Sequence, residues 1–104
     1  MENMTASESL AVANTIRAQL GGALAMLGAK DLVGGESFLQ FGIQGCKTVN
    51  KIRIELDPSD TYTVSFWKLN RKTWICSEVA EVDGVYVDSL HTVIENRTGL
   101  RTRL

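Results

Sequence analysis

Three side chains of this chain could form a cysteine–histidine nucleophile pair: Cys46 or Cys76 with His91. A cysteine becomes a reactive thiolate when a base or a cation lies close to it. No capping helix or local base in the sequence marks either cysteine as activated, although His91 could pair with one of them in the fold. We expect His91 to be a half-buried helix residue and both cysteines to be reduced thiols of a cytosolic protein.

The sequence contains no pattern typical of a metal or nucleotide site. A zinc site needs three or four convergent ligands, and the spacing of Cys46 and Cys76 matches no metal motif. The two Gly-Gly pairs form neither GxGxxG nor GxxxxGK. Asp57 and Asp60 flank a turn, where aspartate is favoured by its backbone hydrogen bonding. We therefore predict that the protein is not an enzyme and has no cofactor or metal.

The composition is that of one ordinary globular domain. Of the 104 residues, 44% are hydrophobic and 22% are charged, and the net charge is −1. No apolar run approaches the roughly 20 residues that span a membrane. The N-terminus carries acids and no basic region, unlike a secretory signal. We expect a single domain over residues 1–104, with residues 1–5 disordered.

The centre of the chain reads as three strands. Apolar and polar residues alternate strictly in Lys51–Asp57, as in a strand with one buried face. Turn residues at 58–60 precede Thr61–Leu69, which is rich in the aromatic and β-branched residues that suit a sheet. A second break at residues 70–72 precedes a third strand, Thr73–Val79. Three strands joined by short turns predict an antiparallel meander.

A helix is expected before the strands, over Ala6–Leu20. Thr5 or Ser7 could cap its first turn, and Gly21 with the next glycine can end it in the left-handed conformation. The apolar stripe of this helix has a spacing of four residues and consists of Val12, Ile16 and Leu20.

The segments between the first helix and the meander are short, and their patterns are weaker. Ala23–Ala29 is apolar but too short to separate helix from strand, and we favour a buried strand because glycines precede and interrupt it. Lys30–Glu36 is expected to be a turn, and Ser37–Ile43 to be a strand with alternating faces. After the meander, Asp83 could cap a final helix, Gly84–Asn96. The apolar face of that helix would be Val87, Leu90, Val93 and Ile94.

The resulting order is helix, five strands, helix. Such an order predicts an α+β fold, a single two-layer domain with an antiparallel meander sheet. The expected core face of the central strands consists of Ile52, Ile54, Leu56, Tyr62, Val64, Phe66, Ile75 and Val79. The opposite, outer face would carry Phe38, Gln40, Lys51, Arg53, Glu55, Thr63, Ser65, Trp67, Trp74, Cys76 and Glu78.

Charge is distributed unevenly along the chain. Residues 41–73 have a balance of +3, whereas residues 1–40 and 74–104 each have −2. A solvated sheet face explains a basic segment of this size at least as well as a function does. The two tryptophans, the phenylalanine and the two cations on the outer face are, however, more than contact with solvent requires. Either the first helix covers this face, or a partner protein or second copy does, or it stacks single-stranded nucleic acid. The candidate binding residues are Phe38, Lys51, Arg53, Trp67, Lys68, Arg71 and Trp74.

Two resemblances bear on function. The order of strands followed by a helix resembles the topology of Whirly, PUR-repeat and coactivator-type single-strand binders, but the sequence pI of about 5.8 is unlike theirs. The sequence from about Thr15 onward resembles short uncharacterised phage and prophage proteins, through an LGG…GAK segment, a strand–turn–strand centre and a TGL ending. In that group a small polar residue would be expected where Leu27 stands.

The phage resemblance implies a mobile-element origin in a bacterial cytoplasm and assigns no activity. We expect a non-enzymatic accessory protein that binds a host or phage protein, with inhibition of that protein as one possible consequence and a homodimer as a further option. The alternative is a single-stranded nucleic-acid binder that uses the aromatic and basic face. A small-ligand pocket between sheet and helix is a third option.

Overall fold

The computed structural model describes residues 11–100 and 102. Five strands form one antiparallel sheet in the order β1-β2-β3-β4-β5, and the predicted α+β fold is confirmed. The elements are α2 (Ala11–Leu20), α3 (Ala23–Met26), β1 (Lys30–Gly34), β2 (Phe38–Gly42), β3 (Lys51–Leu56), β4 (Tyr62–Asn70), β5 (Ile75–Val85), the 3-10 turn η1 (Val87–Ser89) and α4 (Leu90–Thr98).

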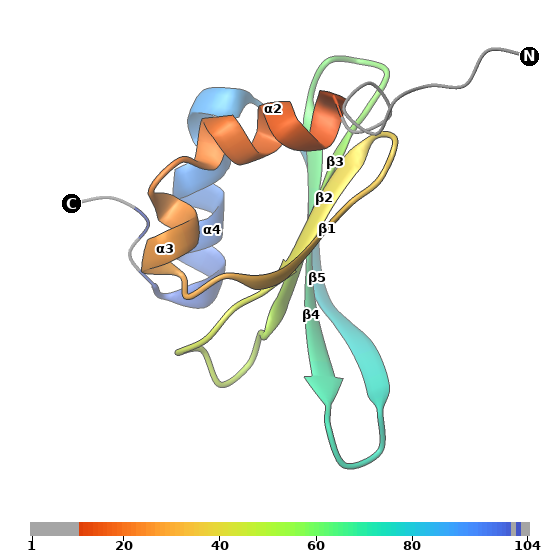
Figure 1. Cartoon of the computed structure of the whole chain (residues 1–104), viewed down its shortest axis with the longest axis vertical. Helices are drawn as coiled ribbons and strands as arrows, with labels where there is room; N and C mark the ends of the chain where they lie inside the picture. The colour runs from red at the N-terminus through yellow and green to blue at the C-terminus, as the bar shows by residue number, and fades with distance from the viewer. Residues whose placement is uncertain (1–10, 101, 103–104) are drawn as a thin grey trace, which may run out of the picture.

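All the described helices lie on one side of the sheet. Figure 1 shows α2, α3 and α4 grouped on one side, with the strands seen nearly edge-on. α2 packs across β2, and α4 packs beside β5. The domain therefore has two layers, and its core lies between them.

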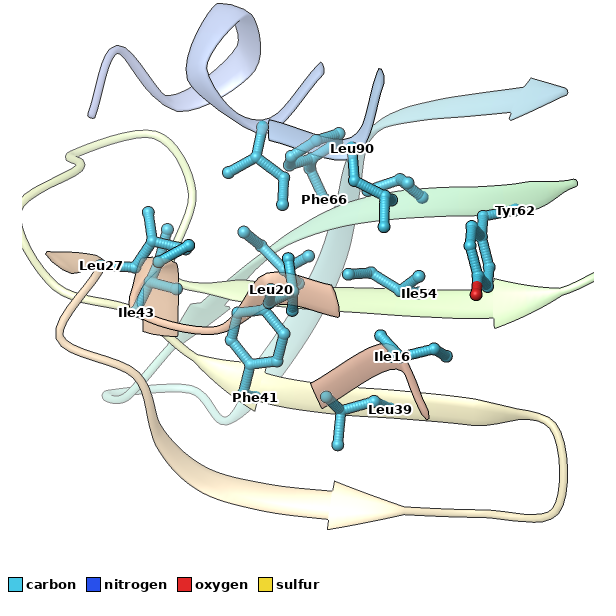
Figure 2. Packing of buried hydrophobic residues seen from close by; sticks show 14 of the residues in the cluster. Ile16, Leu20, Leu27, Leu39, Phe41, Ile43, Ile54, Tyr62, Phe66 and Leu90 are labelled. Carbon is cyan, nitrogen blue, oxygen red and sulfur yellow. The ribbon is translucent and has the colours of Figure 1, made fainter. Parts of the chain in front are cut away.

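The core is built from alternate strand residues and from one stripe of each longer helix. Figure 2 shows Ile16 and Leu20 of α2 facing the sheet residues Phe41 and Ile54. Ile54 and Phe66 are fully buried on the helix-covered face, as predicted from strand parity. Side chains of this size each contribute about 1.5–3 kcal/mol when fully buried.

The first helix agrees with its prediction as far as it is described. α2 ends at Leu20, and Gly21 follows with φ +52°, the left-handed conformation that glycine adopts without steric cost. The proposed caps Thr5 and Ser7, and residues 6–10 of the predicted helix, lie outside the described residues.

The predicted strand Ala23–Ala29 is wrong, because Ala23–Met26 forms the short helix α3. The segment contains alanine, leucine and methionine, all strong helix formers, and no β-branched residue. One turn of helix also buries Ala23 and Leu27, four residues apart, on the same side. Propensity and packing thus outweigh the flanking glycines.

The strand that replaces Ala23–Ala29 in the five-stranded sheet is β1 (Lys30–Gly34), which lies within the predicted turn Lys30–Glu36. It pairs with β2 as an edge strand. An irregularity between Lys30 and Val33 places Asp31 at φ 55°. This irregularity breaks the alternation on which a strand prediction depends.

The predicted third meander strand, Thr73–Val79, begins two residues before the observed strand and ends six residues before it. β5 spans eleven residues, Ile75–Val85, and its first half projects with β4 beyond β3 as a hairpin (Figure 1). Ile75 and Val79 were predicted to be core but are 61% and 49% exposed. Trp74 was predicted in the strand but lies in the β4–β5 turn. Among residues 11–100 and 102, no helix covers this part of the hairpin, so strand parity there does not lead to burial.

The predicted final helix Gly84–Asn96 also begins too early. Gly84 has φ +64° at a register shift that lets β5 continue to Val85. Asp83 is therefore a strand residue and not a helix cap. α4 begins at Leu90, and the predicted helix-face residue Val87 is 48% exposed in η1.

Candidate binding face

The sheet side away from the helices carries most of the candidate residues and is called the outer face below. The strand register arranges it in rows. One row crosses Gln40, Arg53, Ser65 and Glu81, and the next crosses Lys51, Trp67 and Glu78. The remaining outer-face residues are Phe38, Glu55, Thr63 and Cys76.

No described helix covers the outer face (Figure 1). α2 buries Ile16 and Leu20 in the core on the opposite side, so the suggestion that the first helix covers Trp67 is wrong. Trp67 is nevertheless half-buried, because side chains of neighbouring strands flank it. A shallow depression of about 240 Å³ beside it is lined by Gln40, Lys51, Arg53, Trp67 and Cys76.

Phe38 and Arg53 contact each other on this face. The guanidinium carbon of Arg53 lies 3.9 Å from the centroid of the Phe38 ring, within range of a cation–π interaction. The ring also packs closely on Gly35, where an added Cβ would lie 2.0 Å from a ring carbon. These contacts hold the side chains of two predicted binding residues, Phe38 and Arg53, in place within the chain itself.

The two cations of the outer face lie on a different strand from two of its acids, while a third acid, Glu55, shares β3 with the cations. Lys51 and Arg53 lie on β3, and Glu78 and Glu81 lie on β5, with β4 between the two strands. Within the described residues, neither Lys51 nor Arg53 forms an ion pair. The outer face therefore has a basic strip and an acidic strip, separated by the strip that contains Ser65 and Trp67.

A second group of cations lies at the end of the sheet where the hairpin projects. Lys30, Lys51 and Arg71 line a pocket of about 150 Å³. Beside it, the carboxamide of Asn50 donates to the Leu69 carbonyl oxygen at 2.9 Å and accepts from the Leu69 amide at 2.7 Å. Asn50 thus holds β4 in place as a backbone partner would.

The remaining candidate residues do not join the outer face. Lys68 has the opposite strand parity to Trp67. Arg71 and Trp74 lie in the hairpin turn. Trp74 is 72% exposed and has φ 61°, a conformation that is costly for a bulky residue.

Cys46 has a perturbed thiol that the sequence alone did not reveal. Burial raises its pKa, but a hydrogen bond with the Thr48 hydroxyl, backbone hydrogen bonds from Thr48 and Val49, and the charge of Lys68 together lower the pKa below its ordinary value. The Cys46 Sγ–Thr48 Oγ1 distance is 3.5 Å. The Cys-x-Thr spacing is a signal that could have indicated this contact.

Neither cysteine is paired with the histidine. Cys46 and Cys76 are free thiols, and Cys46 makes its polar contact with Thr48. His91 is half-buried in α4, as expected, and its Nδ1 lies 3.0 Å from the Thr102 hydroxyl. Thr102 is buried and donates to Glu95 Oε2 at 2.8 Å. Since that hydroxyl proton is used, Nδ1 of His91 is the donor to Thr102.

Other kinds of site find little support in the described chain. Across residues 11–100 and 102, no three His, Cys, Asp or Glu side chains are grouped to hold a metal ion. Over the same residues, no helix has the length and apolar character to cross a membrane. A depression of about 300 Å³ between β5 and α4 is lined by Val82, Val93, Asn96 and Arg97.

Comparison of the chain with protein-family models, with curated proteins and with solved structures finds no match.

Proposed function

We propose that this protein is a non-enzymatic accessory protein of a phage or mobile element that binds a host or phage protein through the outer face. It acts by covering a surface of that protein in the bacterial cytoplasm, and inhibition is the expected result. No cofactor or metal takes part.

The observation that supports this proposal is an outer face that no described helix covers, with opposite charges on either side of Trp67. Trp and Arg are the residues most often found as anchors at protein interfaces. Charges of both signs on one face complement a protein surface, which itself carries both. The contact between Arg53 and Phe38 orders these side chains in advance and reduces the entropy lost on binding.

The alternative, binding of single-stranded nucleic acid, is supported by a different observation. At the hairpin end of the sheet, Lys51 and Arg71 line one pocket and Arg71 and Lys72 line a second. Arg71 and Lys72 share the β4–β5 turn with the exposed Trp74. Cations beside an exposed aromatic ring can hold phosphates and a stacked base. However, Glu78 and Glu81 on the outer face would repel a phosphate backbone that crosses the sheet.

The test is capture of partners by the tagged protein from the cytoplasm of a bacterial host, with Trp67→Ala beside Arg97→Ala as matched control. Arg97 is exposed on α4, on the helix side of the sheet. A partner of the outer face is retained by Arg97→Ala and lost with Trp67→Ala, while both variants keep the wild-type circular dichroism spectrum. Equal retention by both variants would disprove the use of this face.

A separate titration with a single-stranded oligonucleotide distinguishes the alternative. A protein that makes several phosphate contacts loses affinity steeply between roughly 50 and 200 mM salt, by about 10³-fold or more for six contacts. Strong, salt-sensitive binding that is lost in an Arg71→Ala, Lys72→Ala double variant would favour the nucleic-acid function over the protein-binding one.

A further inference from the structure

The two charged strips of the outer face are related by the strand order. β3 and β5 are both neighbours of β4, one on each side. Arg53 and Glu81 are both opposite Ser65, and Lys51 and Glu78 are both opposite Trp67. We call the positions along β4 of Ser65 and Trp67 two levels. At each level, a cation lies one strand away from β4 on one side and an acid lies one strand away on the other.

We infer that the outer face binds a second copy of this chain, in a dimer whose two-fold axis runs along β4 so that Arg53 meets Glu81 of the second copy. A two-fold axis in that direction exchanges the two sides of β4 and preserves the level along the strand. It therefore places β3 of one copy over β5 of the other, with basic strip facing acidic strip twice. Such self-complementarity is the requirement for a closed two-fold interface.

Elementary sheet geometry permits this arrangement. Packed sheets lie ~10 Å apart with their strands within about 30° of each other. Long side chains such as Arg53 and Glu81 can meet across that gap. The two Trp67 side chains would lie beside the axis, at the centre of the interface, where aromatic residues are favoured.

The dimer is expected to be weak. Five strands spaced ~4.8 Å apart and about six residues long give a face of roughly 500 Å², or about 1,000 Å² buried by two copies, which is near the lower limit for specific interfaces. A third level does not favour the dimer, because Glu55 also lies on the outer face of β3 and β5 of the other copy carries no cation to meet it. We therefore expect reversible association in the micromolar range.

This inference rests on the proposed function in one respect, that the outer face binds protein. It adds a form of regulation, since a dimer would cover the face that the other protein needs. Binding of that protein would then compete with self-association, and dilution would favour it.

The test is sedimentation velocity of the purified full-length chain at ~1 to 300 µM and low salt. The wild type is expected to shift from monomer to dimer over this range. Arg53→Glu and Glu81→Arg are each expected to remain monomeric, because each single variant opposes like charges twice. Lys47→Glu is the matched control: Lys47 is exposed in the β2–β3 loop and off the face, so this variant should dimerise like wild type.

The decisive sample is an equimolar mixture of Arg53→Glu with Glu81→Arg. One variant then carries two acids at this level and the other carries two bases, so both intermolecular pairs are restored in the mixed dimer. We expect the mixture to dimerise with at least half of the wild-type dimer fraction at equal total concentration. No interaction within one chain can produce that rescue.

Three results would overturn the inference: a wild type that is monomeric at 300 µM, single variants that dimerise normally, or a mixture that stays monomeric. Circular dichroism of each variant excludes unfolding as the cause of a monomer. The proposed function is judged separately by the Trp67→Ala capture experiment. A monomeric wild type whose captured partner is lost with Trp67→Ala would refute the dimer and retain the function.

Discussion

The guanidinium of Arg53 lies over the aromatic ring of Phe38, with its central carbon 3.9 Å from the ring centroid. Phe38 and Arg53 are on neighbouring strands but not directly opposite, because Phe38 pairs with Glu55 and Arg53 pairs with Gln40. This diagonal contact allows a phenylalanine to lie on an uncovered sheet face. It also holds the cation that the proposed dimer requires over the Phe38 ring.

Substitution of Gly35 should disturb this contact. An alanine Cβ at position 35 would lie 2.0 Å from Cε1 of Phe38, so the ring must move. We expect Gly35→Ala to lower the free energy of unfolding by about 1–3 kcal/mol, as overpacking does. Gly22→Ala is the control, because no atom lies within 4 Å of its added Cβ and φ is −65°. Urea denaturation measures both, and equal stability of the two variants would contradict the model of Phe38 packing.

Ile54→Ala should lower the free energy of unfolding more than Val79→Ala does. Ile54 is fully buried beneath the helices, and Ile54→Ala is expected to cost about 2–5 kcal/mol through lost burial and the resulting cavity. Val79→Ala, at a 49% exposed position of β5, should change stability by less than ~0.5 kcal/mol. A loss below 1 kcal/mol for Ile54→Ala would mean that the faces of β3 are reversed.

Trp74 should be dispensable for stability. It is 72% exposed with φ 61°, and asparagine adopts the left-handed region more readily than tryptophan does. We expect Trp74→Asn to leave the free energy of unfolding unchanged or to raise it by up to ~1 kcal/mol. Thermal melting measures this, and a clear loss of stability would show that the hairpin end packs against something in the native protein.

The Cys46 thiol should ionise at lower pH than an ordinary cysteine. Although burial raises its pKa, the hydrogen bonds with Thr48 and Val49 and the charge of Lys68 lower it below the ordinary value of 9.0. Thr48→Val removes the hydroxyl partner and should move the pH midpoint of iodoacetamide labelling at Cys46 upward. Mass spectrometry of the labelled peptide gives that midpoint, and an unchanged value would exclude the Thr48 contact as a cause.

The same shift predicts a small dependence of stability on pH. The pKa of Cys46 is lower in the folded than in the unfolded chain, so the unfolded chain binds more protons between the two values. The free energy of unfolding should therefore rise with pH in that window, below about 9.0. This contribution is present above the unfolded pKa and is lost as the pH falls through the folded pKa. Cys46→Ser should abolish it, as measured by urea denaturation at several pH values.

The limits of sequence-based prediction appear most clearly in the corrected elements. Ala23–Met26 was predicted to be part of a strand and is a helix, and Lys30–Gly34 was predicted to be a turn and is a strand. The conformation of such short segments depends on what they pack against and pair with. Trp74, Ile75 and Val79 have strand-like composition, yet their burial depends on whether a helix reaches the hairpin. None does among the described residues, so these side chains remain exposed.

Sequence alone determined the two faces of β2, β3 and β4, because side chains of a strand alternate with a period of two whatever surrounds them. Ile54 and Phe66 could thus be assigned inward, and Arg53 and Trp67 outward. The tertiary structure alone decided that all described helices share one side, so that none of them covers the outer face. It also placed Arg53 and Glu81 at one level on either side of β4, since register joins segments far apart in the chain and no local pattern encodes it.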